Sequence, residues 1–292
     1  MIAICYSRSS ATADSLLGQA RDLGEGVMEA PVSTRDLVLE AVSRAPIGTI
    51  FIPADGVSVD MLSFALSHRK DVGGLALLPG HSARGKTARR ILGFAHAERA
   101  GIKIPDGTCL IESESDALEL ARTCDVCITR PESGWEEWSV HLAEDAHRFV
   151  GRLGHGTAPG VEHLCVEVYL EGERLVSRQF MVTARGHEPR RAARECLLTP
   201  VDDGGISDAA KVFASAVTGY EKRNGVFATH WVVSGPGITL IDFFAGFPPP
   251  FVDRFGNFVS SVASVLRGGK WDWCQGEGFL WRDPVEVERA VP

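Results

Sequence analysis

The residues best suited to chemistry lie in the last third of this 292-residue chain. Two apolar runs, residues 225–231 and 238–242, lie on either side of the turn sequence Ser234-Gly-Pro-Gly237, which predicts a β-hairpin. Asp242 ends an otherwise apolar stretch of the second run, and a carboxylate buried there costs free energy unless it binds something. His230 lies 12 residues earlier (242 − 230 = 12), so a hairpin returns both side chains to one edge. The hairpin therefore places a buried carboxylate beside a histidine.

Basic residues earlier in the chain could contact an anion such as a phosphate. Arginines gather in two groups, Arg84, Arg89 and Arg90, and then Arg185, Arg190, Arg191 and Arg194. Each group is interpreted either as the solvated face of a helix or as an anion contact.

The first 80 residues alternate apolar strands with helical patterns. Strands are predicted at residues 2–6, 48–53 and 74–79, and helices at residues 11–23, 33–45 and 57–68. This alternation is typical of an open parallel sheet with helices on its faces. Asp55 follows the second strand, where it would either face a crevice or cap a helix.

After residue 80 the pattern changes from alternation to hairpins. A helix is predicted from residue 86 to about residue 100, then a turn at 101–105, a helix at 113–124 and a strand at 125–131. Alternating strands around Glu171-Gly172 predict another hairpin, and helices are predicted at 207–220 and 257–266. The fold class is therefore α/β, with an α+β arrangement in the C-terminal part. We expect three lobes, formed by residues 1–80, 84–150 and 151–292.

The order and spacing of these segments, over roughly residues 1–268, resemble the ATP-grasp ligases, with a layout like that of D-alanine:D-alanine ligase. The matching segments are the helix that begins Lys86-Thr87, the turn Gly101-Ile-Lys-Ile-Pro105, the strand that closes on Arg130-Pro131, and Gly160-Val-Glu162 before a hairpin. The resemblance implies an N-terminal open parallel sheet and two further lobes around a cleft.

The same resemblance implies roles for single residues. Lys86 and Arg130 match the positions that contact ATP phosphates, and Glu162 matches the position that contacts the ribose. Asp242 and His230 match the magnesium positions of the family. A solvent-side role for Glu162 at the start of its strand is the open alternative.

Several residues depart from the family's pattern. Arg130 replaces a lysine, His230 an aspartate, Phe244 an asparagine and Ala228 an arginine. Phosphoryl transfer depends on metal-bridged phosphates and a positive clamp, so these replacements favour a degenerate ATP-grasp protein. Such a protein would act without a cofactor, by binding or as a partner subunit in a biosynthetic pathway.

Two other functions stay open. The first is an active ATP-dependent carboxylate–amine ligase, which would form an acylphosphate with ATP and magnesium. Its atypical metal site would need further carboxylates, such as Glu167 or Asp253, to converge on Asp242. The second is an unrelated α/β enzyme.

Composition bears on partners and location. A net charge of −8 argues against a duplex nucleic-acid binder, which needs a concentrated basic surface. No apolar run approaches the roughly 20 residues of a membrane span, and the first residues lack the pattern of a signal peptide. The seven cysteines, an odd number lying mostly in apolar runs, favour a reducing cytoplasm. We expect a cytoplasmic protein that binds a small-molecule carboxylate or a protein partner.

A Cys-x-x-Cys pair and an aromatic C-terminal segment are two further features of the sequence. Cys124-Asp-Val-Cys127 has the spacing of half a zinc site, but a strand would direct its two sulfurs to opposite faces, so we expect no metal there. Residues 271–281 contain three tryptophans and a phenylalanine, which predict docking either on the core or on a second subunit. A homo-oligomer is therefore an open alternative.

Overall fold

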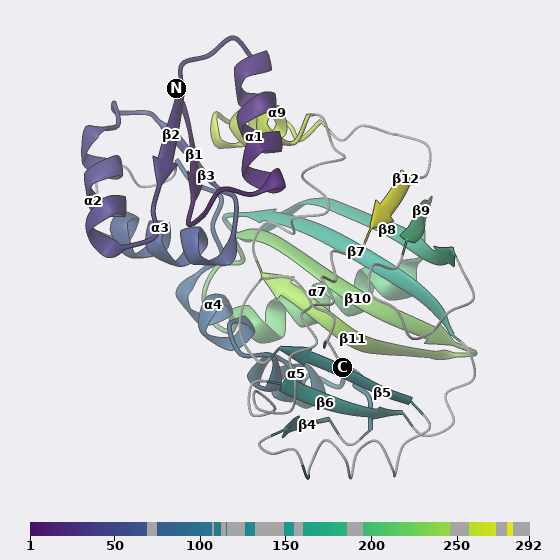
Figure 1. The fold of residues 1–292 in the computed structure, drawn as a ribbon. Coiled ribbons are helices and arrows are strands. Elements are labelled where there is room, and N and C mark those ends of the chain that lie inside the picture. The colour runs from purple at the N-terminus through teal and green to yellow at the C-terminus, as the bar shows by residue number, and fades with distance from the viewer. Residues whose placement is uncertain are drawn as a thin grey trace, which may run out of the picture.

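The computed structural model describes residues 1–68, 75–106, 108–111, 115, 126–131, 149–154, 160–185, 195–245, 257–272 and 279–282. The described residues form three separate sheets, each with its own strand order (Figure 1). No helix within these ranges is long and apolar enough to cross a membrane. Asp253, Cys124, three arginines of the second group (Arg190, Arg191 and Arg194) and nearly all of the predicted helix at 113–124 lie outside them.

The N-terminal lobe is the predicted open parallel sheet. Strands β1 (Ile2–Tyr6), β2 (Val27–Pro31) and β3 (Ile50–Pro53) pair in the order β2-β1-β3. Helices α1 (Ala11–Asp22), α2 (Arg35–Arg44) and α3 (Gly56–His68) cover it, α1 on one face and α2 and α3 on the other (Figure 1). The alternation of side chains explains this, because Ile2 and Ile4 pack with α1 whereas Ala3 and Cys5 pack with α2 and α3.

Local signals account for the boundaries of these helices. Ser10 and Thr34 have extended backbones, and their side chains accept hydrogen bonds from the backbone N–H groups of Ala13 and Leu37, as N-cap residues do. The three predicted helices of this lobe are confirmed to within two residues at each end.

Three expectations for the first hundred residues were incomplete or wrong. Strand β2 was missed, because a short stretch that ends in proline carries little strand signal. The predicted strand at 74–79 is not a strand over its described part. Its backbone is linked to β3 by one bond, from Phe51 N–H to the Leu75 carbonyl, before Pro79 and Gly80 lead into the next helix.

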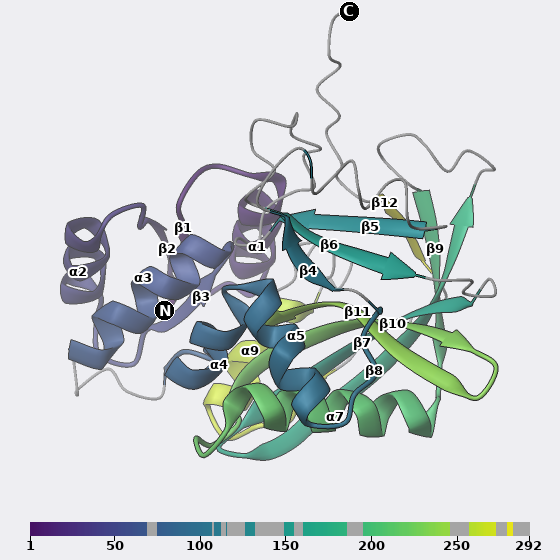
Figure 2. The same ribbon diagram turned by 90° about the horizontal axis from the view of Figure 1, so that it is seen from below.

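The predicted helix at 86–100 is two helices. Helix α4 (His81–Thr87) and helix α5 (Arg90–Arg99) are separated at Arg89, whose φ of −119° and ψ of 115° are those of extended backbone. The break lets the two helices point in different directions while both pack on α7 (Figure 2).

The C-terminal lobe is an antiparallel sheet of six strands in the order β11-β10-β7-β8-β9-β12. Its strands are β7 (Val161–Leu170), β8 (Glu173–Arg185), β9 (Glu195–Val201), β10 (Gly225–Ser234), β11 (Gly237–Ala245) and β12 (Phe279–Arg282). Both predicted hairpins are confirmed. The turn between β7 and β8 uses Glu171 and Gly172 at φ of 52° and 96°, the left-handed backbone that a tight hairpin requires.

Helices cover both faces of this sheet. Helix α7 (Gly204–Thr218) packs on one face together with α5, while α9 (Phe258–Leu266) packs on the other face and against α1 (Figures 1 and 2). Leu164 and Val166 point to the α9 face, and Cys165 and Tyr169 point to the α7 face. The sequence alternation of β7 therefore fills two separate cores.

A small sheet lies beyond the β11 edge of the large one (Figures 1 and 2). It contains β4 (Cys109–Ile111), β5 (Val126–Pro131) and β6 (Phe149–Gly154), paired antiparallel in the order β4-β6-β5. Strand β6 spans residue 150, where we expected one lobe to end. The segment before β4 is tied to β11 by a hydrogen bond of 2.9 Å from Leu240 N–H to the Lys103 carbonyl.

Candidate functional site

The hairpin of β10 and β11 brings His230 and Asp242 together. The two residues are direct partners in the antiparallel register, followed by a β-bulge between His230 and Trp231. Directly opposed residues of an antiparallel pair project to the same face. The predicted juxtaposition is therefore confirmed, and the next pair along the strands on that face is Ala228 with Phe244.

Asp242 is buried and forms an ion pair with Arg90. Its side chain is 1% exposed, and its Oδ1 lies 3.1 Å from Nε of Arg90, which is 4% exposed. The backbone N–H of Phe243 donates to the same oxygen at 2.9 Å. The Arg90 guanidinium also lies 5.6 Å from the centre of the Phe244 ring. Of the two interpretations of its arginine group, the solvated helix face does not hold for Arg90, which is buried. It contacts an anion, and that anion is a carboxylate of the protein itself.

Helix α5 positions Arg90 at this carboxylate. Arg90 is the first residue of α5, directly after the extended Arg89. One turn further on, Gly93 lies against β11 so closely that an added Cβ would stand 2.2 Å from Cζ of Phe243. The absence of a side chain at Gly93 thus sets how near the helix, and with it Arg90, comes to the strand.

Glu162 lies beside His230 on the same face. On β7, Leu164 pairs with His230, and Glu162 is two residues before it. Nε2 of His230 is 3.2 Å from Oε2 of Glu162, an ion pair only when the imidazole is protonated. The geometry is not that of a hydrogen bond, so within the described residues the buried Nε2 has no hydrogen-bond partner. Glu162 is about a quarter exposed and His230 less.

Among known proteins, solved structures match this chain in fold. No protein-family model matches the sequence, and no curated protein sequence matches it. Among solved structures, phosphoribosylamine–glycine ligase from Thermotoga maritima superposes with a TM-score of 0.63 at 11% identity, over 93% of this chain and 77% of that one. D-alanine–D-alanine ligase from Bacillus anthracis superposes with a TM-score of 0.59 at 12% identity, over 91% of this chain and 94% of that one.

A third match is the ADP complex of an N5-carboxyaminoimidazole ribonucleotide synthetase, with a TM-score of 0.58 at 13% identity over 85% of this chain and 71% of that one. The fold is that of the ATP-grasp ligases. The expected resemblance and fold class are confirmed, with the parallel N-terminal sheet and the antiparallel sheet both in place. At identities of 11–13% the matches establish the fold alone, and the chemistry has to be argued from the residues of this chain.

The described residues around Asp242 do not suit magnesium in this ATP-grasp hairpin. Magnesium prefers several oxygen ligands in octahedral geometry. Next to Asp242 on its face the chain offers an imidazole at His230 and apolar side chains at Ala228 and Phe244, and an arginine already contacts the carboxylate. Among the described residues no group of three His, Cys, Asp or Glu side chains could hold a metal ion.

Glu167 does not converge on Asp242 as the active-ligase alternative required. It pairs with Phe227 and points to the α7 face, away from His230. Tyr169 donates to it at 2.7 Å and Arg174 at 2.9 Å. Burial, partly offset by these two hydrogen bonds, raises the pKa of the Glu167 carboxyl above its ordinary value. The other named carboxylate, Asp253, lies outside the described residues.

The two residues predicted to contact phosphate lie on elements other than the hairpin. Lys86, on α4, donates to the carbonyl of Ala216 at 3.2 Å, near the C-terminal end of α7, where a cation is favourable. Arg130 lies on β5 of the small sheet, opposite Val150. The structure thus brings Glu162, His230 and Asp242 together, whereas Lys86 donates to a carbonyl of α7. Their roles toward a nucleotide stay predictions.

Asp55 caps helix α3, which was one of the two roles predicted for it. Its Oδ1 accepts from Ser58 N–H at 2.7 Å, and its Oδ2 accepts from Ser7 N–H at 2.7 Å. These bonds tie the end of β3 to the start of α3 and to the end of β1.

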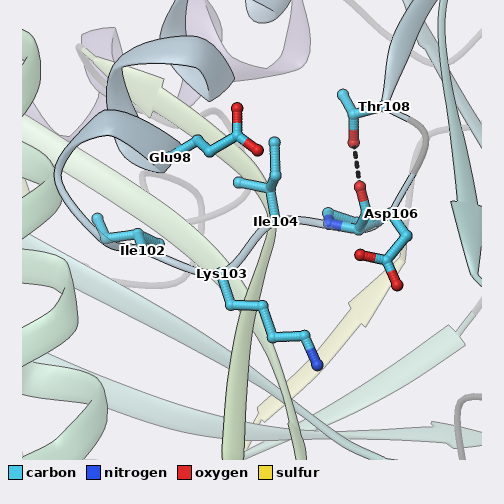
Figure 3. Close-up of a pocket in the computed structure, with 7 residues that line it drawn as sticks. Glu98, Ile102, Lys103, Ile104, Asp106 and Thr108 are labelled. Carbon is cyan, nitrogen blue, oxygen red and sulfur yellow. Dashed lines mark hydrogen bonds between the residues drawn. The ribbon is translucent and has the colours of Figure 1, made fainter.

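A polar cavity of about 310 Å³ lies on the connection between α5 and β4 (Figure 3). It is lined by Glu98, Ile102, Lys103, Ile104, Pro105, Asp106 and Thr108. This stretch contains the Gly-Ile-Lys-Ile-Pro turn. The Thr108 hydroxyl donates a hydrogen bond of 2.6 Å to the Pro105 carbonyl at the end of that turn. The residues predicted to bind phosphate, ribose or metal do not line this cavity.

Arg90 is the residue of this candidate site that the sequence did not connect with Asp242. It is 152 positions from Asp242 in the chain, and no spacing rule connects them. Its signal was the arginine group around the start of α5, to which sequence alone could assign no partner.

Proposed function

We propose that this chain is a degenerate ATP-grasp-fold protein that works by binding a small-molecule carboxylate or as a partner subunit in a biosynthetic pathway. One observation carries the proposal, namely that Ala228 and Phe244 face each other beside Asp242. Ala228 is fully buried and Phe244 packs on the core, so the positions that would supply an arginine and an oxygen ligand are apolar. Phosphoryl transfer depends on charge at these positions.

The activity test is ADP formation by purified protein with ATP, magnesium or manganese, and a panel of amino-acid pairs. We expect no substrate-dependent ADP above background, because the charge of the transferring phosphoryl group would be left without compensation. Substrate-dependent ADP that disappears in Asp242→Asn would overturn the proposal. It would establish the alternative, an active carboxylate–amine ligase, which draws its support from the buried Asp242 retained on the hairpin.

Nucleotide binding without turnover is compatible with this proposal and can be tested on Arg130. If ATP binds, Arg130→Ala is expected to weaken it by roughly 1.5–3 kcal/mol, the cost of a lost hydrogen bond to a charged group. Calorimetry with ATP, with and without magnesium, measures this. Lys86→Ala is the companion variant, since Lys86 contacts the end of α7 and would have to leave the Ala216 carbonyl to reach a phosphate. Unchanged affinity in Arg130→Ala would remove that residue from the site.

The cytoplasm is the location we propose. Cys5, Cys109 and Cys165 are free thiols, and burial raises the pKa of Cys5 and Cys165 above the ordinary value, which keeps them unreactive as packed side chains. Reduced, buried cysteines are typical of proteins in a reducing compartment.

A further inference from the structure

We propose that Arg90 is the permanent counter-ion of Asp242 and takes the place of a divalent cation at this end of the hairpin. The inference deepens the proposed function and rests on it in one respect, because both start from an ATP-grasp fold without its magnesium site. It adds that the positive charge is still present, supplied by α5 of the same chain.

The carboxylate is satisfied by donors of the protein. Oδ1 of Asp242 receives Nε–H of Arg90 at 3.1 Å and the backbone N–H of Phe243 at 2.9 Å. A cation binding to that oxygen would displace one or both donors. Arg90 and Asp242 are nearly inaccessible to water, so removing either leaves a buried charge without compensation, which is unfavourable.

Three contacts hold Arg90, or the segment of chain that carries it, against β11. The Phe244 ring lies under its guanidinium, an arrangement that favours a cation. Gly93 fixes α5 against Phe243 of the same strand. The bond from Leu240 N–H to the Lys103 carbonyl ties the segment after α5 to β11. The helix that carries Arg90 and the segment after it therefore contact β11 at Phe243 and at Leu240, one on each side of Asp242 along the strand.

The residues next to Asp242 also lack the oxygen ligands that a divalent cation needs. Magnesium and manganese bind through several oxygen ligands. On this face the residue opposite Asp242 is His230, and the next pair is Ala228 with Phe244, none of which supplies a side-chain oxygen. Glu162, a carboxylate on that face, lies beside the His230 imidazole, with its Oε2 3.2 Å from Nε2.

The first experiment measures metal binding directly. Free Mn²⁺ is followed by electron paramagnetic resonance during titration into wild type and into Asp242→Asn, without nucleotide. We expect the two proteins to give the same binding curve, whether or not Mn²⁺ binds elsewhere. Saturable Mn²⁺ binding to wild type that is lost in Asp242→Asn would overturn the inference. Should Asp242→Asn fail to fold, the same titration is made on the double variant Arg90→Met/Asp242→Asn, in which neither member of the pair is charged, and the same two outcomes apply.

The second experiment tests the pair itself by a double-mutant cycle on stability. Arg90→Met and Asp242→Asn each leave one buried charge, so each is expected to lower the melting temperature. The double variant is expected to melt higher than the sum of the two shifts predicts. Additive shifts would overturn the inference. The control is Arg84→Met, which breaks the more exposed pair of Arg84 with Asp60 and is expected to be additive with Asp242→Asn.

The outcomes separate this inference from the proposed function. ADP formation that persists in a metal chelator would contradict the degenerate function and agree with Arg90 as the cation. Mn²⁺ bound at Asp242 without any ADP formation would overturn the role of Arg90 and leave the degenerate function in place.

Discussion

Glu167 shows how a single carboxyl group responds to its place on the α7 face of the large sheet. It is 1% exposed, with Tyr169 and Arg174 as its hydrogen-bond partners. Burial is the largest influence on its pKa, which is raised above the ordinary value of 4.5. The folded state therefore keeps a proton on Glu167 at pH values where the unfolded chain has released it. The free energy of unfolding then falls as pH rises through that window.

This predicts a pH-dependent difference between wild type and Glu167→Gln, which cannot ionise. Wild type should lose stability relative to the variant as pH rises from about 4.5 through the raised pKa of Glu167. Urea unfolding across this range measures the difference. Glu171→Gln is the matched control, since that side chain is 71% exposed and should shift with wild type. A constant difference at all pH values would contradict the raised pKa.

At the scale of elements, the contact of α5 with β11 decides the geometry of the candidate site. The contact is made where Gly93 meets Phe243, whose ring also packs edge-on against Phe94 at a centroid distance of 4.9 Å. Arg90 lies one turn earlier on the same helix. The position of the arginine therefore depends on a glycine that has no polar role.

Gly93→Ala is expected to destabilise the protein by about 1–3 kcal/mol, because the added methyl group overlaps the Phe243 ring. Gly18→Ala in α1 is the control, since nothing lies within 4 Å of its added Cβ. That helix position should gain roughly 0.5–1 kcal/mol from the reduced freedom of alanine. Chemical denaturation of both variants measures the contrast. Equal effects of the two substitutions would show that α5 does not approach β11 this closely.

At the scale of the whole molecule, the last described helix ties the C-terminal lobe to the N-terminal one. Arg267, at the end of α9, donates to both carboxylate oxygens of Glu25 at 2.6 Å. The backbone N–H of Val259 donates to the Gln19 side chain, and Trp271 packs on Phe258 at a centroid distance of 5.8 Å. Trp271 thus docks on the core, one of the two expected outcomes for the aromatic tail.

The Glu25–Arg267 pair predicts an acid-sensitive junction between the lobes. The hydrogen bonds from Arg267 lower the pKa of Glu25 below 4.5, so the contribution of the pair is present above that pH. It is lost as pH falls through the lowered pKa. Because the pair is partly exposed, Arg267→Ala should cost only about 0–1 kcal/mol near neutral pH, less at high salt, and nothing once Glu25 is protonated. Thermal unfolding at neutral and acidic pH measures this, and a cost that grows with acidity would contradict it.

Local patterns in the sequence were sufficient for much of this fold. Helices α1, α2 and α3 followed from apolar periodicity, with a Ser/Thr start signal for α2, and both hairpins followed from glycine turns between alternating strands. The turn also sets the register, so the pairing of His230 with Asp242 could be predicted. The order of these elements was enough to indicate the ATP-grasp fold.

Only the tertiary structure decided what Asp242 contacts. Arg90 reaches it from 152 positions away, because α5 breaks from α4 at Arg89 and approaches β11 at Gly93. Neither the break nor the approach leaves a periodic signal. The face of each strand residue was likewise settled by packing, which turned Glu167 toward α7 and away from Asp242. Periodicity reports which residues share a face, whereas long-range packing determines which charge that face meets.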